Sequence, residues 1–195
     1  MVERRSDAGS TYRLRIAIRH VRPPVWRRIE VPADTTLTGL HDILQTVFGW
    51  TDSHLHQFEA RGTLYRIPDS EDVGWGPPVR DEGETDLQQI LGQRFKRFVY
   101  EYDFGDGWLH DITVEQRLQA EAGARHPRCT AGRRACPPED CGGPWGYARL
   151  LAVVADPDHP EHDERREWLG EAFDPEAFDL DAVNRALARR WGTEG

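Results

Sequence analysis

Two stretches near the start of the chain alternate between apolar and polar residues. Residues 12–18 are apolar at every second position, and most of the positions between are arginine. This period of two is typical of a β-strand with one buried face. Arg22-Pro23-Pro24 interrupts the pattern, because proline fixes φ and has no backbone N–H to donate. The alternation resumes over residues 25–31, so we expect a second strand antiparallel to the first.

The next segment changes to the three- and four-residue spacing of an amphipathic helix. Apolar residues at this spacing over residues 37–48 predict the helix. Oxygen atoms of residues 34–36 can cap its first turn, and Gly49 suits its C-terminal end. Two strands followed by a helix are the opening of a β-grasp fold.

Further strands are predicted in the middle of the chain. Residues 54–60 and 63–67 have the composition of a paired hairpin. Residues 68–84 are rich in glycine, proline and acids, and we expect an exposed loop there. A short helix over residues 85–91 completes this region.

The clearest hairpin in the sequence follows. Aromatic and aliphatic residues alternate over 98–104 and over 108–114, on either side of Gly105-Asp106-Gly107. A connection with cysteines and prolines is expected over residues 119–143, and apolar spacing after it predicts three helices.

These elements predict an α+β fold, with a mixed or antiparallel sheet, a β-grasp-like start and a helical C-terminal third. We expect a flexible N-terminus at residues 1–11 and a single domain over residues 12–191. Its expected parts are a sheet-rich part (12–118), the cysteine and proline connection (119–143) and a helical part (144–191).

Composition and charge restrict the class of protein. The chain has 195 residues and a formal net charge of -9, with no apolar run of the roughly 18 residues that would span a bilayer. Three cysteines are too few for a secreted disulfide scaffold, and residues 1–11 lack the apolar stretch of a signal peptide. We therefore expect a cytoplasmic protein. Acidic blocks on both sides of the modest basic segments argue against direct nucleic-acid binding, which leaves a protein partner as the candidate.

The cysteines form the first candidate site. Six residues separate Cys129 from Cys136, and four separate Cys136 from Cys141. Three thiolates and one histidine would complete a tetrahedral zinc shell, with His110 as the fourth ligand in our prediction and with His126, His54 or His56 as alternatives. The competing interpretation is three reduced cysteines that pack as small hydrophobic residues.

The histidines form the second candidate site. His54 and His56 lie two apart on a predicted strand and so share a face, and His110 lies on a predicted neighbouring strand. If these strands are adjacent, the imidazoles could converge beside His41 of the helix. Converging imidazoles ligate Zn, Fe or Ni, or exchange protons near neutral pH. The alternative is core histidines that are hydrogen-bonded to backbone or carboxylate groups.

Carboxylates surround the predicted hairpin and follow the cysteines. Asp103, Asp106, Glu139 and Asp140 could act in acid–base chemistry. Aspartate is also what hairpin turns recruit for local hydrogen bonds, and we favour turn and arginine-pairing roles.

An aromatic and arginine-rich surface is the last candidate. Trp26 and Arg28, together with the arginines of the first strand, could bind an acidic partner or a phosphate group. The alternative is a solvated strand face.

Several blocks of the chain, in one order, resemble a known family. They are Pro23-Pro24-Val25-Trp26-Arg27-Arg28, Phe48-Gly49-Trp50, His54-Leu55-His56, Tyr102-Asp103-Phe104-Gly105-Asp106 and Pro137-Pro138-Glu139-Asp140-Cys141-Gly142-Gly143. Over residues 12–169 the chain resembles the plasmid pRiA4b ORF-3-like family. The resemblance implies a compact α+β domain and an association with plasmids and mobile elements. It implies no established activity, although some relatives carry the labels resolvase or repressor.

Three functional hypotheses follow. The sequence has no GxSxG elbow, no GxxxxGK[ST] loop, no GxGxxG after a strand and no HExxH pair. We therefore favour a binding or adaptor domain over an enzyme. The first alternative is a zinc-dependent hydrolase that uses the Cys/His cluster, with Glu139 or Asp140 as the proton carrier. The second alternative is a DNA-associated regulator.

Overall fold

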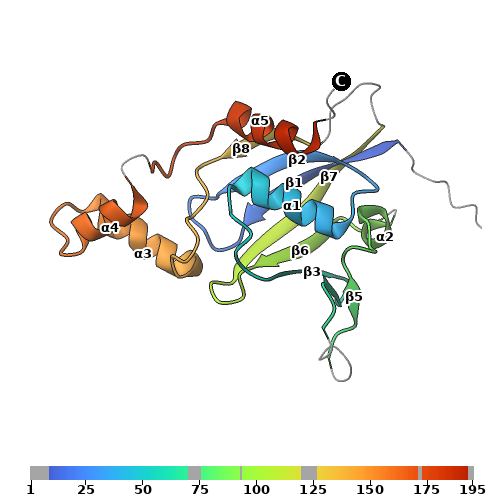
Figure 1. The fold of residues 1–195 in the computed structure, drawn as a ribbon, viewed down its shortest axis with the longest axis horizontal. Helices are drawn as coiled ribbons and strands as arrows, with labels where there is room; N and C mark the ends of the chain where they lie inside the picture. The colour runs from blue at the N-terminus through green and yellow to red at the C-terminus, as the bar shows by residue number, and fades with distance from the viewer. Residues whose placement is uncertain (1–8, 70–75, 93, 120–126, 171–172, 193–195) are drawn as a thin grey trace, which may run out of the picture.

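A computed structural model describes residues 9–69, 76–92, 94–119, 127–170 and 173–192. Its strands are β1 (Ser10–Ile18), β2 (Trp26–Pro32), β3 (His56–Ala60), β4 (Thr63–Arg66), β5 (Val79–Asp81), β6 (Arg97–Tyr102), β7 (Trp108–Gln119) and β8 (Arg128–Arg133). Its helices are α1 (Leu37–Phe48), α2 (Leu87–Leu91), α3 (Gly143–Ala155), α4 (His162–Leu169) and α5 (Leu180–Trp191). Figure 1 shows that α1 lies across the sheet.

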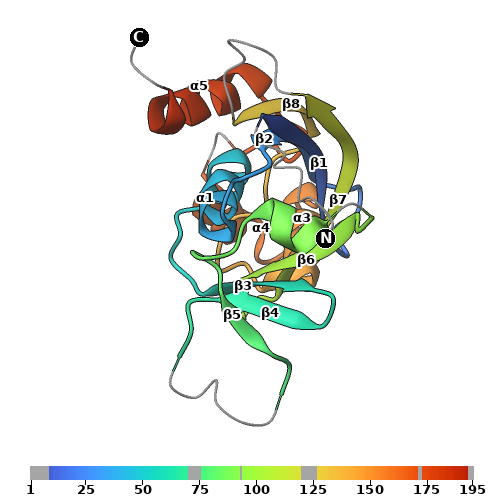
Figure 2. The same cartoon turned by 90° about the vertical axis from the view of Figure 1, so that its right-hand side faces the viewer.

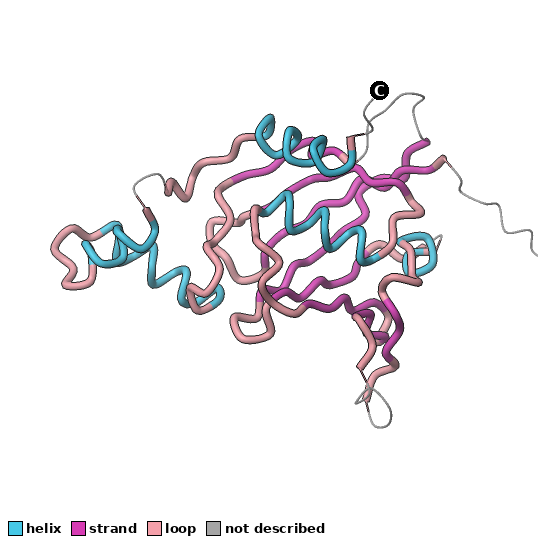
Figure 3. Tube along the Cα trace, viewed as in Figure 1, coloured by secondary structure: helices cyan, strands magenta, loops and turns pink. Residues whose placement is uncertain are grey.

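The described strands form one sheet in the order β5-β4-β3-β6-β7-β1-β2-β8. Neighbouring strands are antiparallel except β4 and β5, which are parallel. The sheet is therefore mixed, and the α+β prediction is confirmed (Figure 3). The predicted opening is also present, because β1 pairs with β2 in a hairpin and α1 follows.

The core lies between the sheet and α1. The apolar positions predicted on β1 are all buried, as are Leu37, Leu40 and Leu44 on α1. Thr36 caps this helix by accepting a hydrogen bond from the Gly39 N–H, as the sequence predicts. Burial of each such leucine contributes roughly 1.5–3 kcal/mol, so the apolar stripe fixes which face of α1 meets the sheet.

The buried side chain of Arg27 connects the C-terminal end of α1 to β2 and β8. The Arg27 guanidinium donates to the carbonyl oxygens of Val47, Trp26 and Arg133. Burial lowers the pKa of this guanidinium. The Val47 carbonyl belongs to the last turn of α1, where the helix dipole favours a positive charge.

The C-terminal helices occupy the periphery of the sheet. α5 packs against α1 and β8, on the same side of the sheet as α1 (Figure 2). α3 and α4 pack against each other beyond one end of the strands (Figure 1). No helix in the described part of the chain combines the length and the apolar character needed to cross a membrane.

Two predicted irregular segments contain strands. The predicted exposed loop over 68–84 includes β5, and Glu82 within it is only 1% exposed. The predicted connection over 119–143 includes β8, which pairs with β2 at the edge of the sheet. β5 owes its place to parallel pairing with β4 and β8 to pairing with the distant β2, and local composition reveals neither contact. Residues 70–75 and 120–126 lie outside the described residues.

Candidate metal centre

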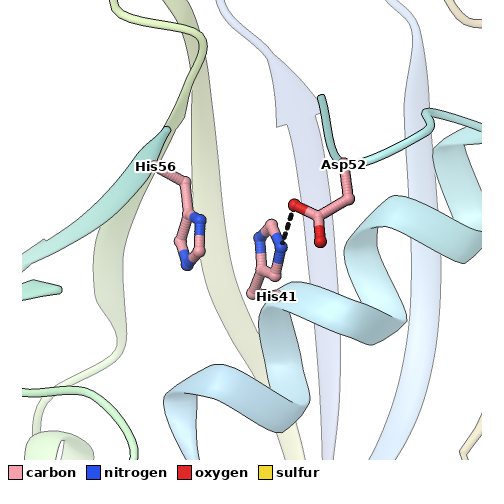
Figure 4. A group of neighbouring side chains, drawn as sticks. All are labelled: His41, Asp52 and His56. Carbon is pink, nitrogen blue, oxygen red and sulfur yellow. Dashed lines mark hydrogen bonds and ion pairs between the residues drawn. The ribbon is translucent and has the colours of Figure 1, made fainter. Parts of the chain in front are cut away.

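Two histidines and an aspartate meet at the end of the sheet where β3 begins. His41 lies on α1, His56 is the first residue of β3, and Asp52 lies in the loop between them. One nitrogen of each imidazole and one oxygen of the carboxylate all lie within 4.8 Å of one another. Figure 4 shows the two rings face to face and Asp52 reaching His41 from the loop. The ring centroids are 3.5 Å apart and the ring planes differ by 6°.

The chain reaches this geometry through the end of α1. Gly49 ends the helix with a φ of 84°, which glycine adopts without strain. Trp50 then anchors the loop, because its ring stacks on Tyr102 and its Nε1–H donates to the Pro137 carbonyl oxygen. Asp52 also has a positive φ, of 58°, a conformation that aspartate tolerates better than most residues. The loop thereby returns Asp52 to the helix that carries His41.

A closed set of hydrogen bonds fixes the tautomer of His41. The Asp52 N–H donates to Gln45 Oε1, so the Gln45 amide nitrogen is the group that donates to the Tyr100 oxygen. The Tyr100 hydroxyl proton then points to His41 Nδ1, at 2.7 Å. His41 therefore carries its proton on Nε2 and donates it to Asp52, at 2.9 Å.

Burial keeps His41 and Tyr100 in their neutral forms. Burial and the neighbouring His56 lower the pKa of His41, against the opposing effect of Asp52. Burial also raises the pKa of Tyr100 well above its ordinary value, so this phenol stays protonated and can donate. His41 is consequently an uncharged imidazole at neutral pH.

A buried carboxylate holds the second imidazole. His56 Nε2 lies 3.0 and 3.1 Å from the two oxygens of Glu82, which also accepts from the Thr38 hydroxyl at 3.3 Å. Second partners of this kind orient the histidines that ligate metals. With Nε2 bonded to Glu82, Nδ1 is the nitrogen left for a further ligand.

A second group of donors lies beside the first. His54 Nε2 lies 3.7 Å from an Asp103 oxygen and 3.3 Å from an Asp140 oxygen, and the three donor atoms lie within 4.8 Å of one another. Asp103 also accepts from the N–H groups of Gly105 and Asp106. It thus has the turn role that we favoured from the sequence.

The other predicted carboxylates join the hairpin to the segment before α3. Asp106 accepts from the Gly142 N–H at 3.1 Å. Glu139 accepts from the hydroxyls of Tyr102 and Thr51. Both contacts hold the start of α3 near the candidate centre.

The structure does not bring the cysteines together with His110. Among the described residues, no group of three donor side chains within 4.8 Å includes Cys129, Cys136 or Cys141. Burial raises the pKa of all three thiols, that of Cys141 to about 12, so the thiols are protonated in the metal-free chain. The zinc site predicted from the cysteines stays a prediction, and His126 lies outside the described residues.

His110 occupies the core instead of joining a ligand set. Its Nδ1 is 3.0 Å from the Trp108 carbonyl oxygen, so Nδ1 carries the proton. The rings of Phe48 and Trp50 meet it edge to face. Burial lowers the pKa of His110 to about 4, as expected for a neutral core imidazole.

The arginines predicted as a partner surface are paired within the sheet. Arg28 pairs with Glu115 at 2.6 Å, and Arg13 pairs with Glu30 at 2.7 Å. The guanidinium groups of Arg15 and Arg28 both lie over the Trp26 ring, with their central carbons 5.2 and 5.4 Å from its centroid. Contacts within the chain therefore engage the arginines and the tryptophan on this face of the sheet.

Sequence reasoning placed His41 and His56 in one candidate group but missed three residues of the centre. Asp52 offered a weak signal, as an acid in the short loop between a helix and a strand that both carry histidines. Glu82 offered none, because its segment has the composition of an exposed loop. Tyr100 offered no signal beyond its place in the aromatic alternation of the predicted hairpin, and its side chain is fully buried.

The comparisons with known proteins agree with the fold. The chain matches the family described as Plasmid pRiA4b ORF-3-like protein over residues 10–182. The chain belongs to this family. A relative from Sinorhizobium fredii (strain NBRC 101917 / NGR234), the uncharacterized protein y4hQ, is 40% identical over 188 residues, which cover 94% of this chain and 95% of that protein.

A solved structure supports the same architecture. The crystal structure of the protein of unknown function MM3350 from Methanosarcina mazei Go1 superposes with a TM-score of 0.81. It is 36% identical, and the match covers 88% of this chain and 96% of that chain. The family resemblance seen in the sequence is thereby confirmed, and these relatives carry no assigned activity.

Proposed function

We propose that this protein binds a divalent transition-metal ion, such as Zn²⁺, through His41, Asp52 and His56. The observation that carries the proposal is the approach of two imidazole nitrogens and one carboxylate oxygen within 4.8 Å, from three separate segments. Two imidazoles and one carboxylate are a donor set that binds Zn²⁺ and Fe²⁺ in other proteins.

The surroundings of the three residues support this proposal. Each imidazole already has a second partner, Tyr100 for His41 and Glu82 for His56. Such partners increase metal affinity by fixing the orientation of the ring, and Glu82 also favours the His56 tautomer whose Nδ1 is free to bind a metal. Three protein ligands also leave at least one coordination position open, as in catalytic rather than structural sites.

Binding requires a local rearrangement. The two rings are parallel, so their in-plane lone pairs do not converge on one point. One ring must turn, and the His41 proton must move from Nε2 to Nδ1. Asp52, whose side chain is more than half exposed, can then move from the His41 N–H to the ion.

Calorimetric titration of the full chain, stripped with chelator, tests the proposal. We expect about one Zn²⁺ per chain, and at least a hundredfold loss of affinity in His56→Asn and in Asp52→Asn. The matched control is His162→Asn on α4, which removes a histidine outside both donor groups and should retain full affinity. Absence of zinc binding by the parent chain, or unchanged binding in His56→Asn, would exclude this site.

The wider role that we propose is a cytoplasmic binding module with a protein partner, in plasmid or mobile-element biology. Its support is the family description, the three free cysteines and the pairing of the sheet arginines within the chain. The same pairing argues against direct DNA binding, because the arginines are not free to neutralise phosphates. DNA retention that falls steeply with salt would contradict this role.

A zinc-dependent hydrolase is the second candidate, with the histidine centre in place of the cysteines. A pocket that His56 lines favours it, because a substrate can reach the centre there. Hydrolysis of p-nitrophenyl acetate by the zinc-loaded chain, and its loss in His56→Asn, would support it.

A further inference from the structure

A pocket of about 530 Å³ opens at the same end of the sheet as the candidate metal centre. Its lining includes Leu55, His56, Ile67, Pro68 and Phe104. These residues belong to the segments where β3 begins and where β4 and β6 end. The volume lies within the range of small-molecule sites, roughly 300–1,000 Å³.

Several non-polar side chains around this pocket are exposed to solvent. Leu55 is 73% exposed, Ile67 is 74% exposed and Phe104 is 43% exposed. They are three of the five large hydrophobic side chains that are exposed in the described part of the chain. A cluster of this kind around a concave surface is typical of a ligand site rather than of scattered surface residues.

His56 connects the pocket to the metal centre. This residue lines the pocket, and its imidazole stacks on His41. Two neutral imidazoles and one carboxylate give a divalent ion and its three ligands a charge of +1, which the Glu82 carboxylate behind His56 offsets from a greater distance. The open position on the ion itself still favours an anionic ligand atom. Arg66 and Asp69 also line the pocket, and their opposite charges leave its walls without a net charge.

We infer that this pocket binds the non-polar group of a small organic anion whose charged end ligates the metal held by His41, Asp52 and His56. The inference rests on the proposed metal site and adds the class of ligand. The ligand combines a carboxylate-like end with an aliphatic or aromatic group that covers Leu55, Ile67 and Phe104.

Two hydroxamates that differ only in chain length test this inference. Acetohydroxamate carries the metal-binding group alone, and hexanohydroxamate adds an aliphatic chain. Titration into the zinc-loaded full chain should show at least about tenfold tighter binding of the longer compound, because each buried methylene favours binding. The preference should disappear in Leu55→Ser/Ile67→Ser, while the affinity for acetohydroxamate stays the same.

The matched control is Trp145→Ser, which removes a side chain that is 74% exposed and does not line this pocket. It should keep the preference for the longer compound. Equal binding of the two hydroxamates by the zinc-loaded parent, or a preference that survives the double substitution, would overturn the inference and leave the metal site intact. A parent chain that takes up no zinc would instead refute the proposed function, and this inference with it.

Discussion

Replacement of His110 should make the stability of the protein less sensitive to acid. The imidazole is fully buried and neutral, and its pKa falls from 6.5 to about 4 on folding. Below pH 6.5 the unfolded chain binds a proton here that the folded chain refuses, so acid favours the unfolded state. This loss of stability continues until the pH falls to the folded pKa.

The size of this loss of stability follows from the difference between the unfolded and folded pKa values of His110. About 2.5 pH units at roughly 1.4 kcal/mol per unit give a loss of about 3 kcal/mol between pH 7 and pH 4. His110→Leu should lack this contribution, although it should be less stable at pH 7 because the hydrogen bond to the Trp108 carbonyl is lost. The pKa values of Glu30 and Glu115 are also lowered on folding, by arginines and not by His110, and their acid dependence should remain in both proteins.

Urea denaturation at several pH values between 4 and 7 measures the difference. The control is Ile112→Val, on the same strand and also fully buried. It should cost roughly 0.5–1.5 kcal/mol at every pH and leave the slope unchanged. The reasoning fails if the free energy of unfolding of His110→Leu falls with acid as steeply as that of the parent.

Three further substitutions test other contacts. Arg27→Leu should reduce the free energy of unfolding by about 2–4 kcal/mol in urea denaturation, because buried carbonyl groups lose their donor. Gly143→Ala should lower the thermal midpoint by several degrees, since a Cβ there would lie 2.2 Å from the Asp106 carbonyl oxygen. Glu82→Gln should weaken zinc binding by about 10–100-fold in a chelator competition, because the carboxylate that orients His56 is lost.

The sequence predicted the elements in which apolar residues repeat at the period of a strand or a helix, because that repeat marks the buried face. One face is buried in the core in each of β1, β2 and α1. Apolar residues therefore recur at every second position in the two strands and at every third or fourth position in the helix. β5 is short and pairs in parallel with the preceding strand β4, and β8 is weakly patterned and pairs with β2, which lies far along the chain. Their composition therefore resembles that of loops, and periodicity could not find them.

The candidate centre was only partly predictable for a related reason. His41 and His56 were identified as ligand-type residues near one another, since α1 packs on the sheet that includes β3. The contribution of Asp52 depends on the course of a loop, and that of Glu82 depends on β5 bringing its segment alongside β4. Neither contribution can be predicted from the local pattern of apolar and polar residues. His54 and His110 share the predicted sheet but lie in other surroundings, one beside Asp140 and one in the core.

X-ray absorption at the zinc edge of the zinc-loaded protein is the most direct test of the metal centre. Bond lengths and scatterer types distinguish nitrogen and oxygen ligands, at about 2.0–2.2 Å, from thiolate sulfur, at about 2.3 Å. We expect a shell with two imidazole nitrogens and carboxylate or water oxygens, contributed by His41, His56 and Asp52. A shell that contains sulfur from Cys129, Cys136 or Cys141 would contradict this account and restore the cysteine site.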